Sequence, residues 1–228
     1  MKEYAIIVAG GSGSRMQNDT PKQFLLLNGK PILLHTVEAF FNYSIDISII
    51  LVLPSAELPR WVEIYNKFHV NFPVKIVKGG KSRFQSVKNG LTNIAIDDSL
   101  VAIHDGVRPL IHPEIILKSF KLAQTDGCSV ASTPLKESLR IVEKDNSKAT
   151  DRAKYRSIQT PQTFQTHLIK SAYNKFDDSA EFTDDASVAE KNGQKILLFD
   201  GSYENIKITT PDDLLFAEAI LKHRKKRQ

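Results

Sequence analysis

The feature of this 228-residue chain that most limits its fold is the alternation of short apolar runs with amphipathic segments. Continuous runs of Val, Ile and Leu are typical of strands buried on both faces of a sheet, whereas apolar residues at helical spacing indicate helices. The pattern of strand, loop and helix occurs four times and is followed by a fifth strand. We predict these strands at residues 4–9, 47–53, 74–77, 100–103 and 128–133.

Such alternation predicts an α/β fold, with a Rossmann-like, mostly parallel sheet flanked by helices on both faces. Ligands of these sheets bind beyond the carboxyl ends of the strands. We therefore expect the loops after Ala9, Val77 and Ile103 to lie along one edge of the sheet. The chain has no internal repeat and no long linker, so we predict a single domain over residues 1–228.

The pattern changes between residues 134 and 160. Strand-like segments at 137–142 and 155–159 flank a polar turn, which predicts a protruding β-hairpin arm over about 134–160. An isolated hairpin is marginally stable in water, so the arm should pack either on a second subunit or on its own domain. Beyond the arm we expect helices at 164–176, at 183–192 with Thr183 as N-cap and at 211–222, and strands at 196–199 and 205–209.

Charge and composition exclude several classes of protein. The net charge of +5 equals the charge of the five Lys and Arg residues in 222–227, so the body is near neutral, and no nucleic-acid-binding motif accompanies this tail. No apolar run approaches the ~20 residues of a membrane span. The N-terminus leads into the first strand without a signal-peptide pattern, and the single Cys128 can form no internal disulfide. We therefore predict a cytoplasmic protein that binds neither nucleic acid nor membrane.

The first predicted strand is followed by Gly10, Gly11 and Gly13, with Arg15 and Lys22 beyond them. Glycines let a backbone approach a ligand closely, and successive N–H groups in such a turn form a concave anion site. The stretch therefore indicates a phosphate-binding loop, although a plain tight turn would use the same glycines.

This loop is neither of the two common kinds. A P-loop needs Lys and then Ser or Thr after its last glycine, but Gly13 is followed by Ser14 and Arg15. The dinucleotide fingerprint needs a third glycine where Met16 stands, which disfavours a dinucleotide oxidoreductase. The six histidines show no zinc-site spacing, and the chain has no Gly-x-Ser-x-Gly nucleophile elbow.

Cations predominate among the charged residues of the predicted loops. Nucleotidyl transfer depends on positioning and on stabilising charge on the transferred phosphorus group, which Arg and Lys do well. Asp105, at a strand end, could orient Mg²⁺, which takes one or two carboxylates plus substrate phosphates. The charged loop residues are Arg15, Lys22, Lys81, Arg83, Asp105, Arg108, Arg152, Asp184 and Lys207.

Six motifs follow one another along nearly the whole chain. Together they resemble the 2-C-methyl-D-erythritol 4-phosphate cytidylyltransferase family, within the sugar-phosphate nucleotidyltransferases. The six are 9–16 with 21–23, Gly79 and Gly80 with Arg83 and Ser86, 104–109, 160–164, 183–186 and 205–214.

The resemblance implies a reaction in which CTP and the alcohol phosphate give a CDP-alcohol and pyrophosphate, with Mg²⁺ or another divalent cation. It implies that Arg15 and Lys22 stabilise the charge at the reacting phosphorus and on the departing pyrophosphate. The remaining nucleotide contacts implied are Gly10, Gly11 and Gly13 around the triphosphate, Gly80 and Ser86 at cytosine, and Gly106 beside the ribose.

The same resemblance implies how the acceptor is held. Asp105 and Arg108 would hold the alcohol, while Lys207, together with Arg152 from a partner subunit, would bind its phosphate. The other acceptor residues implied are Thr160, Thr183 and Ser138, the last of which stands where the family commonly has threonine. In this family the arm exchanges contacts in a homodimer, so a homodimer is expected here.

Two alternatives remain open. A ribitol 5-phosphate cytidylyltransferase would have the same fold and nucleotide loop and would differ in the acceptor pocket. The motifs around Arg152, Thr160 and Thr183 are more similar to the methylerythritol enzymes. A non-catalytic nucleotide-binding module predicts the loss of a phosphate-binding cation, whereas Arg15, Lys22 and Lys207 are all present.

Overall fold

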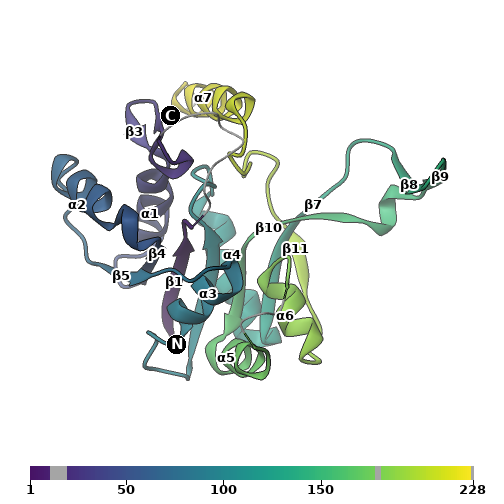
Figure 1. Cartoon of the computed structure of the whole chain (residues 1–228), viewed down its shortest axis with the longest axis horizontal. Helices are drawn as coiled ribbons and strands as arrows, with labels where there is room; N and C mark the ends of the chain where they lie inside the picture. Colours follow the sequence, from purple (N-terminus) through teal and green to yellow (C-terminus); the bar gives the residue numbers. More distant parts are fainter. Residues whose placement is uncertain (11–19, 178–180, 227–228) are drawn as a thin grey trace.

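The computed structural model describes residues 1–10, 20–177 and 181–226. Among these residues, seven strands form one central sheet in the order β11-β7-β10-β6-β1-β4-β5 (Figure 1). The strands of this sheet are β1 (Lys2–Val8), β4 (Ser48–Leu53), β5 (Val74–Lys78), β6 (Ser99–Asp105), β7 (Cys128–Pro134), β10 (Arg156–Gln165) and β11 (Leu198–Asp200).

The sheet is mostly parallel, as predicted. β1 lies parallel between β4 and β6, β5 extends the sheet beyond β4, and β11 runs parallel to β7. Among the described strands of this central sheet, only β10 breaks the rule, because it runs antiparallel to both of its neighbours, β6 and β7. The α/β fold class predicted from the alternation is therefore confirmed.

Helices cover both faces of the sheet because the buried strands present apolar side chains on both sides. In β1, Ala5 and Ile7 face one cluster while Tyr4 and Ile6 face the other, as the two-residue period of a strand requires. The helices are α1 (Ile32–Tyr43), α2 (Leu58–Lys67), α3 (Arg83–Leu91), α4 (Pro113–Asp126), α5 (Thr166–Lys175), α6 (Asp185–Lys191) and α7 (Pro211–Lys225).

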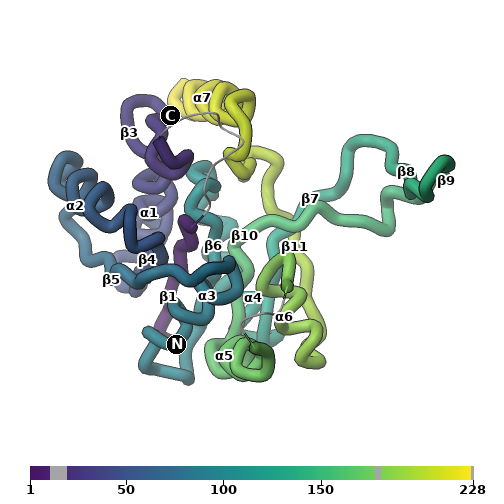
Figure 2. The backbone as a smooth tube through the Cα atoms, in the orientation of Figure 1, coloured from purple at the N-terminus to yellow at the C-terminus, as the bar shows by residue number. Residues whose placement is uncertain are grey.

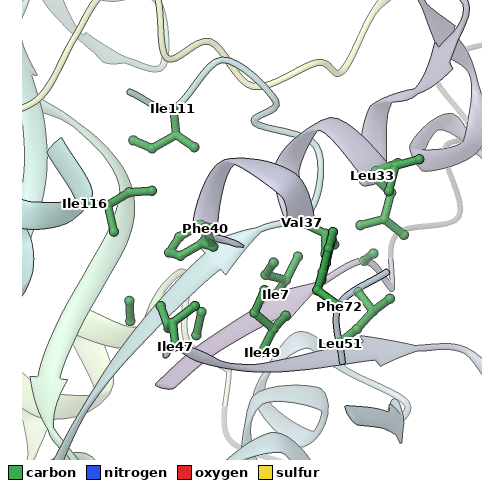
Figure 3. Close-up of a cluster of buried hydrophobic side chains, with 14 of the residues drawn as sticks. Ile7, Leu33, Val37, Phe40, Ile47, Ile49, Leu51, Phe72, Ile111 and Ile116 are labelled. Atoms are coloured by element: carbon green, nitrogen blue, oxygen red, sulfur yellow. The ribbon is translucent and has the colours of Figure 1, made fainter. Parts of the chain in front are cut away.

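The first core cluster packs α1, α2 and α4 against one face of the sheet. Figure 3 shows Val37 and Phe40 of α1 lying over Ile7 and Ile49, which come from the neighbouring strands β1 and β4. The second cluster packs α3, α5 and α6 against the other face. This two-sided burial fixes the strands, and so it fixes the loops that leave their carboxyl ends.

The C-terminal helix α7 begins with a capping box at Thr210, whose hydroxyl accepts the N–H of Asp213 while the Asp213 carboxylate accepts the N–H of Thr210. It packs through a third, smaller cluster that includes Ile208 and Ala217 and that also contains Leu27 of the short strand β2 (Leu26–Leu27), the partner of β3 (Lys30–Pro31). Within the described parts of the chain, none of the helices combines the length and the apolar character that crossing a bilayer would need.

The arm is a separate two-stranded hairpin of β8 (Leu139–Glu143) and β9 (Asn146–Thr150), joined to the body by β7 and β10. Its strands extend away from the sheet, and the tube in Figure 2 shows only the two connecting segments leading back to the body. The arm therefore does not fold onto its own domain, and Ile141 and Val142 are exposed on it.

Four local predictions were wrong. The returning strand of the hairpin is β9, whereas residues 155–159 lie mostly in β10 of the main sheet. β10 also continues through Phe164, so the next helix begins at Thr166. The N-cap of α6 is Asp184, whose carboxylate accepts the N–H of Ser187, and not Thr183. Residues 205–209 form no strand: the Ile206 N–H donates to the Glu204 carbonyl in a turn, and the Ile208 N–H donates to the Val107 carbonyl.

Candidate active site

The described first residues of the loops after β1, β5 and β6 lie along one edge of the sheet, as predicted. Short hydrogen bonds hold them to the strand ends: the Gly106 N–H donates to the Val8 carbonyl at 2.8 Å and the Gly79 N–H to the Leu53 carbonyl at 2.8 Å. Between these loops is a first cavity of about 230 Å³. It is lined by Val8, Ala9, Gly10, Lys22, Gln23, Gly80, Lys81, Ser82, Arg83, Ser86, Asp105, Val107 and Lys207.

One wall of the first cavity is a tight turn that leads into α3. The Ser86 hydroxyl donates to the Ser82 carbonyl at 2.8 Å and accepts the Gly80 N–H at 3.1 Å. A side chain cannot be added at Gly80, since its Cβ would lie 2.2 Å from the Cβ of Gln85. The turn therefore holds its backbone and the buried Ser86 hydroxyl in fixed positions at the cavity, which suits recognition of a planar polar ring.

The lining of the first cavity also includes Lys22 and Gln23, in the short 3₁₀ helix Lys22–Phe24. The Gln23 side chain is buried and donates from Nε2 to the Ala9 carbonyl at 3.1 Å, which ties this segment to the end of β1. Lys22 therefore lies at the cavity on a segment anchored to the sheet edge. The sequence analysis placed Gln23 within the motif 21–23 but assigned it no role, because nothing local showed that its side chain would reach the end of β1.

A second cavity, of about 270 Å³, adjoins the first. Arg83, Asp105 and Lys207 line both of them, so these side chains form a common wall. The second cavity brings together five of the seven residues predicted to hold the acceptor, and the two missing ones are Ser138 and Arg152. The five are Asp105, Arg108, Thr160, Thr183 and Lys207. This cavity also contains Ile158, Gln159, Gln162 and Asp184.

Asp105 is the centre of the common wall. Its Oδ2 accepts from Nε of Arg108 and lies 3.1 Å from Nζ of Lys207. Burial opposes the charged carboxylate, but Lys207, Arg108 and Arg83 together lower the pKa of Asp105 below its ordinary value. The carboxylate is therefore ionised at neutral pH, and it holds two cations at the boundary between the cavities.

Behind Asp105 lies a buried polar layer. Nδ1 of His104 lies 3.0 Å from the Thr160 hydroxyl oxygen, which also accepts the Asp105 N–H at 3.1 Å. Burial lowers the pKa of His104 to about 4, so the ring is neutral at pH 7. The side chain of Asn205 donates from Nδ2 to the Thr160 carbonyl, and the backbone carbonyl of Asn205 accepts from Nη1 of Arg108 at 2.8 Å. These contacts fix Asp105 and Arg108 in place.

Arg83, the third residue of the common wall, is held by the carboxylate of Asp185. Its Nη1 and Nη2 donate to the two carboxylate oxygens of Asp185, at 2.9 and 2.6 Å. Asp185 is fully buried and also accepts the Tyr173 hydroxyl at 2.6 Å. Burial disfavours the charged guanidinium, but Asp185 raises the pKa of Arg83 above its ordinary value. The arginine is therefore a fixed cation at the common wall.

The remaining predicted site residues are not among the described residues that line these cavities. Gly11, Gly13 and Arg15 lie outside the described residues. Gly106 packs into the end of β1, where a Cβ would lie 2.9 Å from that of Ala9. Ser138 and Arg152 belong to the arm, where Nη1 of Arg152 donates to the Lys136 carbonyl. In one chain, the structure therefore separates the arm residues from the rest of the predicted acceptor site.

The residues present fit a single divalent cation shared with substrate phosphates. Both ion pairs of Asp105 use Oδ2, and Oδ1 makes none within the described part of the chain. The described residues include no cluster of three His, Cys, Asp or Glu side chains that would form a complete protein site. Mg²⁺ commonly binds through one or two carboxylates with phosphates and water as its other ligands, which matches this donor set.

The comparisons with known proteins agree with this geometry. A family model for 2-C-methyl-D-erythritol 4-phosphate cytidylyltransferase matches residues 4–223. The chain belongs to this family. Family members from Porphyromonas gingivalis and Phocaeicola vulgatus are 45% and 42% identical, over 96% and 97% of this chain and 98% and 100% of theirs.

The fold agrees as well. The crystal structure of 4-diphosphocytidyl-2C-methyl-D-erythritol synthase from Anaerococcus prevotii is 31% identical, with a TM-score of 0.84 over 97% of this chain and 96% of that one. A 2-C-methyl-D-erythritol 4-phosphate cytidylyltransferase from Thermus thermophilus has a TM-score of 0.81 at 28% identity. As a member of this family, the chain is a nucleotidyltransferase.

Proposed function

We propose that this protein transfers a cytidylyl group from CTP to 2-C-methyl-D-erythritol 4-phosphate and releases pyrophosphate, a step in isoprenoid precursor synthesis. The observation that carries the proposal is the common wall of Arg83, Asp105 and Lys207 between two adjoining cavities. A transfer reaction needs two substrates side by side, with fixed positive charge where their phosphates meet.

In this proposal CTP occupies the first cavity and the alcohol phosphate the second. Gly80 and Ser86 bind cytosine, and the N-terminal loop with Gly10, Gly11 and Gly13 surrounds the triphosphate. Gly106 shapes the ribose end by bringing its loop against β1. An oxygen of the acceptor phosphate bonds to the α-phosphorus, and the bond from that phosphorus to the bridging oxygen breaks. Its electron pair leaves with pyrophosphate.

The cations act on the charge that this exchange moves. Lys22 at the first cavity, with Arg15 beyond the described residues, stabilises the crowded α-phosphorus and the departing pyrophosphate. Lys207 binds the acceptor phosphate at the common wall. A divalent cation held by Asp105 and the phosphates would neutralise further negative charge. Arg108, Thr160 and Thr183 orient the alcohol.

We further propose that the protein is a cytoplasmic homodimer and that each chain is a single domain with an arm. A hairpin with exposed Ile141 and Val142 that extends from its own body gains stability by packing on another subunit. In such a dimer, Arg152 and Ser138 of each arm would complete the acceptor site of the other subunit. This accounts for their separation from the cavities within one chain.

The test is pyrophosphate release by the purified protein with CTP, Mg²⁺ and methylerythritol phosphate, each omitted in turn. We expect release only when all three are present. Ribitol 5-phosphate is the matched control, since it offers the same phosphate on a different alcohol. Faster turnover with ribitol 5-phosphate would overturn the acceptor assignment, and no release with either alcohol would overturn the activity.

A further inference from the structure

The ion pair between Arg83 and Asp185 is bidentate, whereas Arg108 and Lys207 each contact a single oxygen of Asp105. Arg83 lines both cavities, whereas Asp185 is fully buried behind it and lines neither. The two residues are 102 positions apart, at the first residues of α3 and α6. The pair therefore connects the helix beside the first cavity with the helix beside the second.

The Arg83 guanidinium is held in one orientation and does not use all of its N–H groups to bind Asp185. Two of its five N–H groups donate to Asp185, and among the described residues the guanidinium has no other hydrogen-bond partner. The bidentate contact fixes the plane of the group, and the Tyr173 hydroxyl fixes the carboxylate in turn. The remaining N–H groups belong to a side chain that lines both cavities.

A fixed cation at this point meets a specific need of the reaction. The acceptor phosphate and the α-phosphate of CTP are both anionic, and they must approach to bonding distance. Lys207 is paired with Asp105 at the same wall and Arg83 with Asp185, but Arg83 keeps N–H groups beyond the two that its carboxylate partner uses. Planar guanidinium groups bind two phosphate oxygens at once, which a single ammonium does less well.

We propose that Arg83 is a catalytic residue that bridges the acceptor phosphate and the α-phosphate of CTP, with Asp185 and Tyr173 as the residues that position it. The proposal rests on the proposed function, because it names a role within that reaction. While the new oxygen–phosphorus bond forms and the bond to pyrophosphate breaks, Arg83 offsets the repulsion between the two phosphates. No proton is transferred in this step.

The competing explanation is that the pair only holds α3 against α6. A double variant separates the two. Arg83→Gln alone leaves Asp185 buried with only Tyr173 beside it, which should lower the melting temperature. In Arg83→Gln/Asp185→Asn, two neutral amides replace the two charges, so much of the stability should return.

We expect kcat to fall by about 100-fold in Arg83→Gln, with the dissociation constant for CTP changed less than threefold. In the double variant kcat should stay low although the melting temperature recovers. Arg83→Lys should recover only part of the rate, because it keeps the charge and loses the planar group. Tyr173→Phe should lower kcat by less than tenfold. Lys170→Gln is the matched control, since its ion pair with Asp97 lies outside both cavities, and it should keep wild-type kcat.

The outcomes are distinct. If the double variant regains both stability and wild-type kcat, Arg83 has only a structural role and the inference is wrong. Wild-type kcat in Arg83→Gln would also overturn it while leaving the proposed function intact. If the wild-type protein itself releases no pyrophosphate from CTP and methylerythritol phosphate, the proposed function fails first and the inference fails with it.

Discussion

The hydroxyl oxygen of Thr160 accepts the backbone N–H of Asp105 at 3.1 Å and thereby joins β10 to the carboxyl end of β6. Residues 159–161 interrupt the regular pairing of β10, whose register with β7 shifts between Ile158 and Gln162. At this irregularity a side chain, not the ladder, satisfies the N–H of Asp105. The Thr160 hydroxyl therefore holds the backbone of Asp105, while Arg108 and Lys207 hold its carboxylate.

Replacing Thr160 by Val should weaken both stability and acceptor binding. The substitution keeps the shape but leaves the Asp105 N–H and the His104 ring without their partner, which should cost about 1–3 kcal/mol of unfolding free energy. Urea titration measures this loss, and steady-state kinetics should show a higher KM for the acceptor. Thr160→Ser keeps the hydroxyl and is the control. Equal losses in the two variants would contradict a role for the hydroxyl.

Because His104 is buried as a neutral ring, the free energy of unfolding should decrease as the pH falls below neutrality. Its pKa is about 4 when folded, against an ordinary value of 6.5, so the unfolded chain binds the extra proton first. The stability present above pH 6.5 is therefore lost as the pH falls toward 4, by up to roughly 3 kcal/mol. We expect His104→Gln to flatten the dependence of the urea midpoint on pH between 7.5 and about 4.5. Parallel curves for the two proteins would refute this assignment.

Lys22→Ala should lower kcat by roughly 10²–10³-fold, because it removes a cation from the proposed transition-state contacts. Circular dichroism should show an unchanged fold, since the 3₁₀ helix stays anchored through Gln23. The control is Lys75→Ala. Lys75 is an exposed residue of β5 that donates to the Asn93 carbonyl and does not line the first cavity. An unchanged kcat in Lys22→Ala would remove Lys22 from the proposed chemistry.

Mixing two inactive variants should restore activity if the arm completes a neighbouring site. Arg152→Ala loses an acceptor contact, and Lys22→Ala loses a nucleotide contact. In a mixed dimer one site receives both intact residues, so an equal, fully exchanged mixture should recover about a quarter of wild-type activity. Two affinity tags would isolate the mixed dimers for assay. No recovery in those dimers would mean that Arg152 and Lys22 do not meet across subunits.

The five strands predicted before residue 134 were found because each reads as a short run of apolar and small residues. Four of them, β1, β4, β6 and β7, are largely buried, whereas β5 is an edge strand with Ile76 exposed. β10 could not be located in the same way. Its buried residues include Thr160, Gln162 and Thr163, whose polar groups are satisfied by distant partners such as Asp184 and Ser119. A polar strand of this kind has no apolar period, and so its continuation was read as the start of a helix.

The site was predictable where its residues follow strand ends, as Gly80 and Asp105 do. The resemblance to a family supplied the roles of these residues, which spacing alone could not. The Arg83–Asp185 pair had no signal in the sequence, since nothing local indicates that residues at the starts of α3 and α6 meet. Contacts of this range emerge only when both helices pack on the same face of the sheet.

The two cavities are lined mostly by residues from different parts of the sequence. The first is built almost entirely from residues before 108, whereas the wall that belongs to the second alone comes mostly from residues 158–184. Substitutions in the later stretch can thus reshape the second cavity, the proposed acceptor site, without changing a described residue of the first, the proposed nucleotide site. A duplicated gene could acquire a new alcohol phosphate in this way while it inherits the cytidylyl donor unchanged.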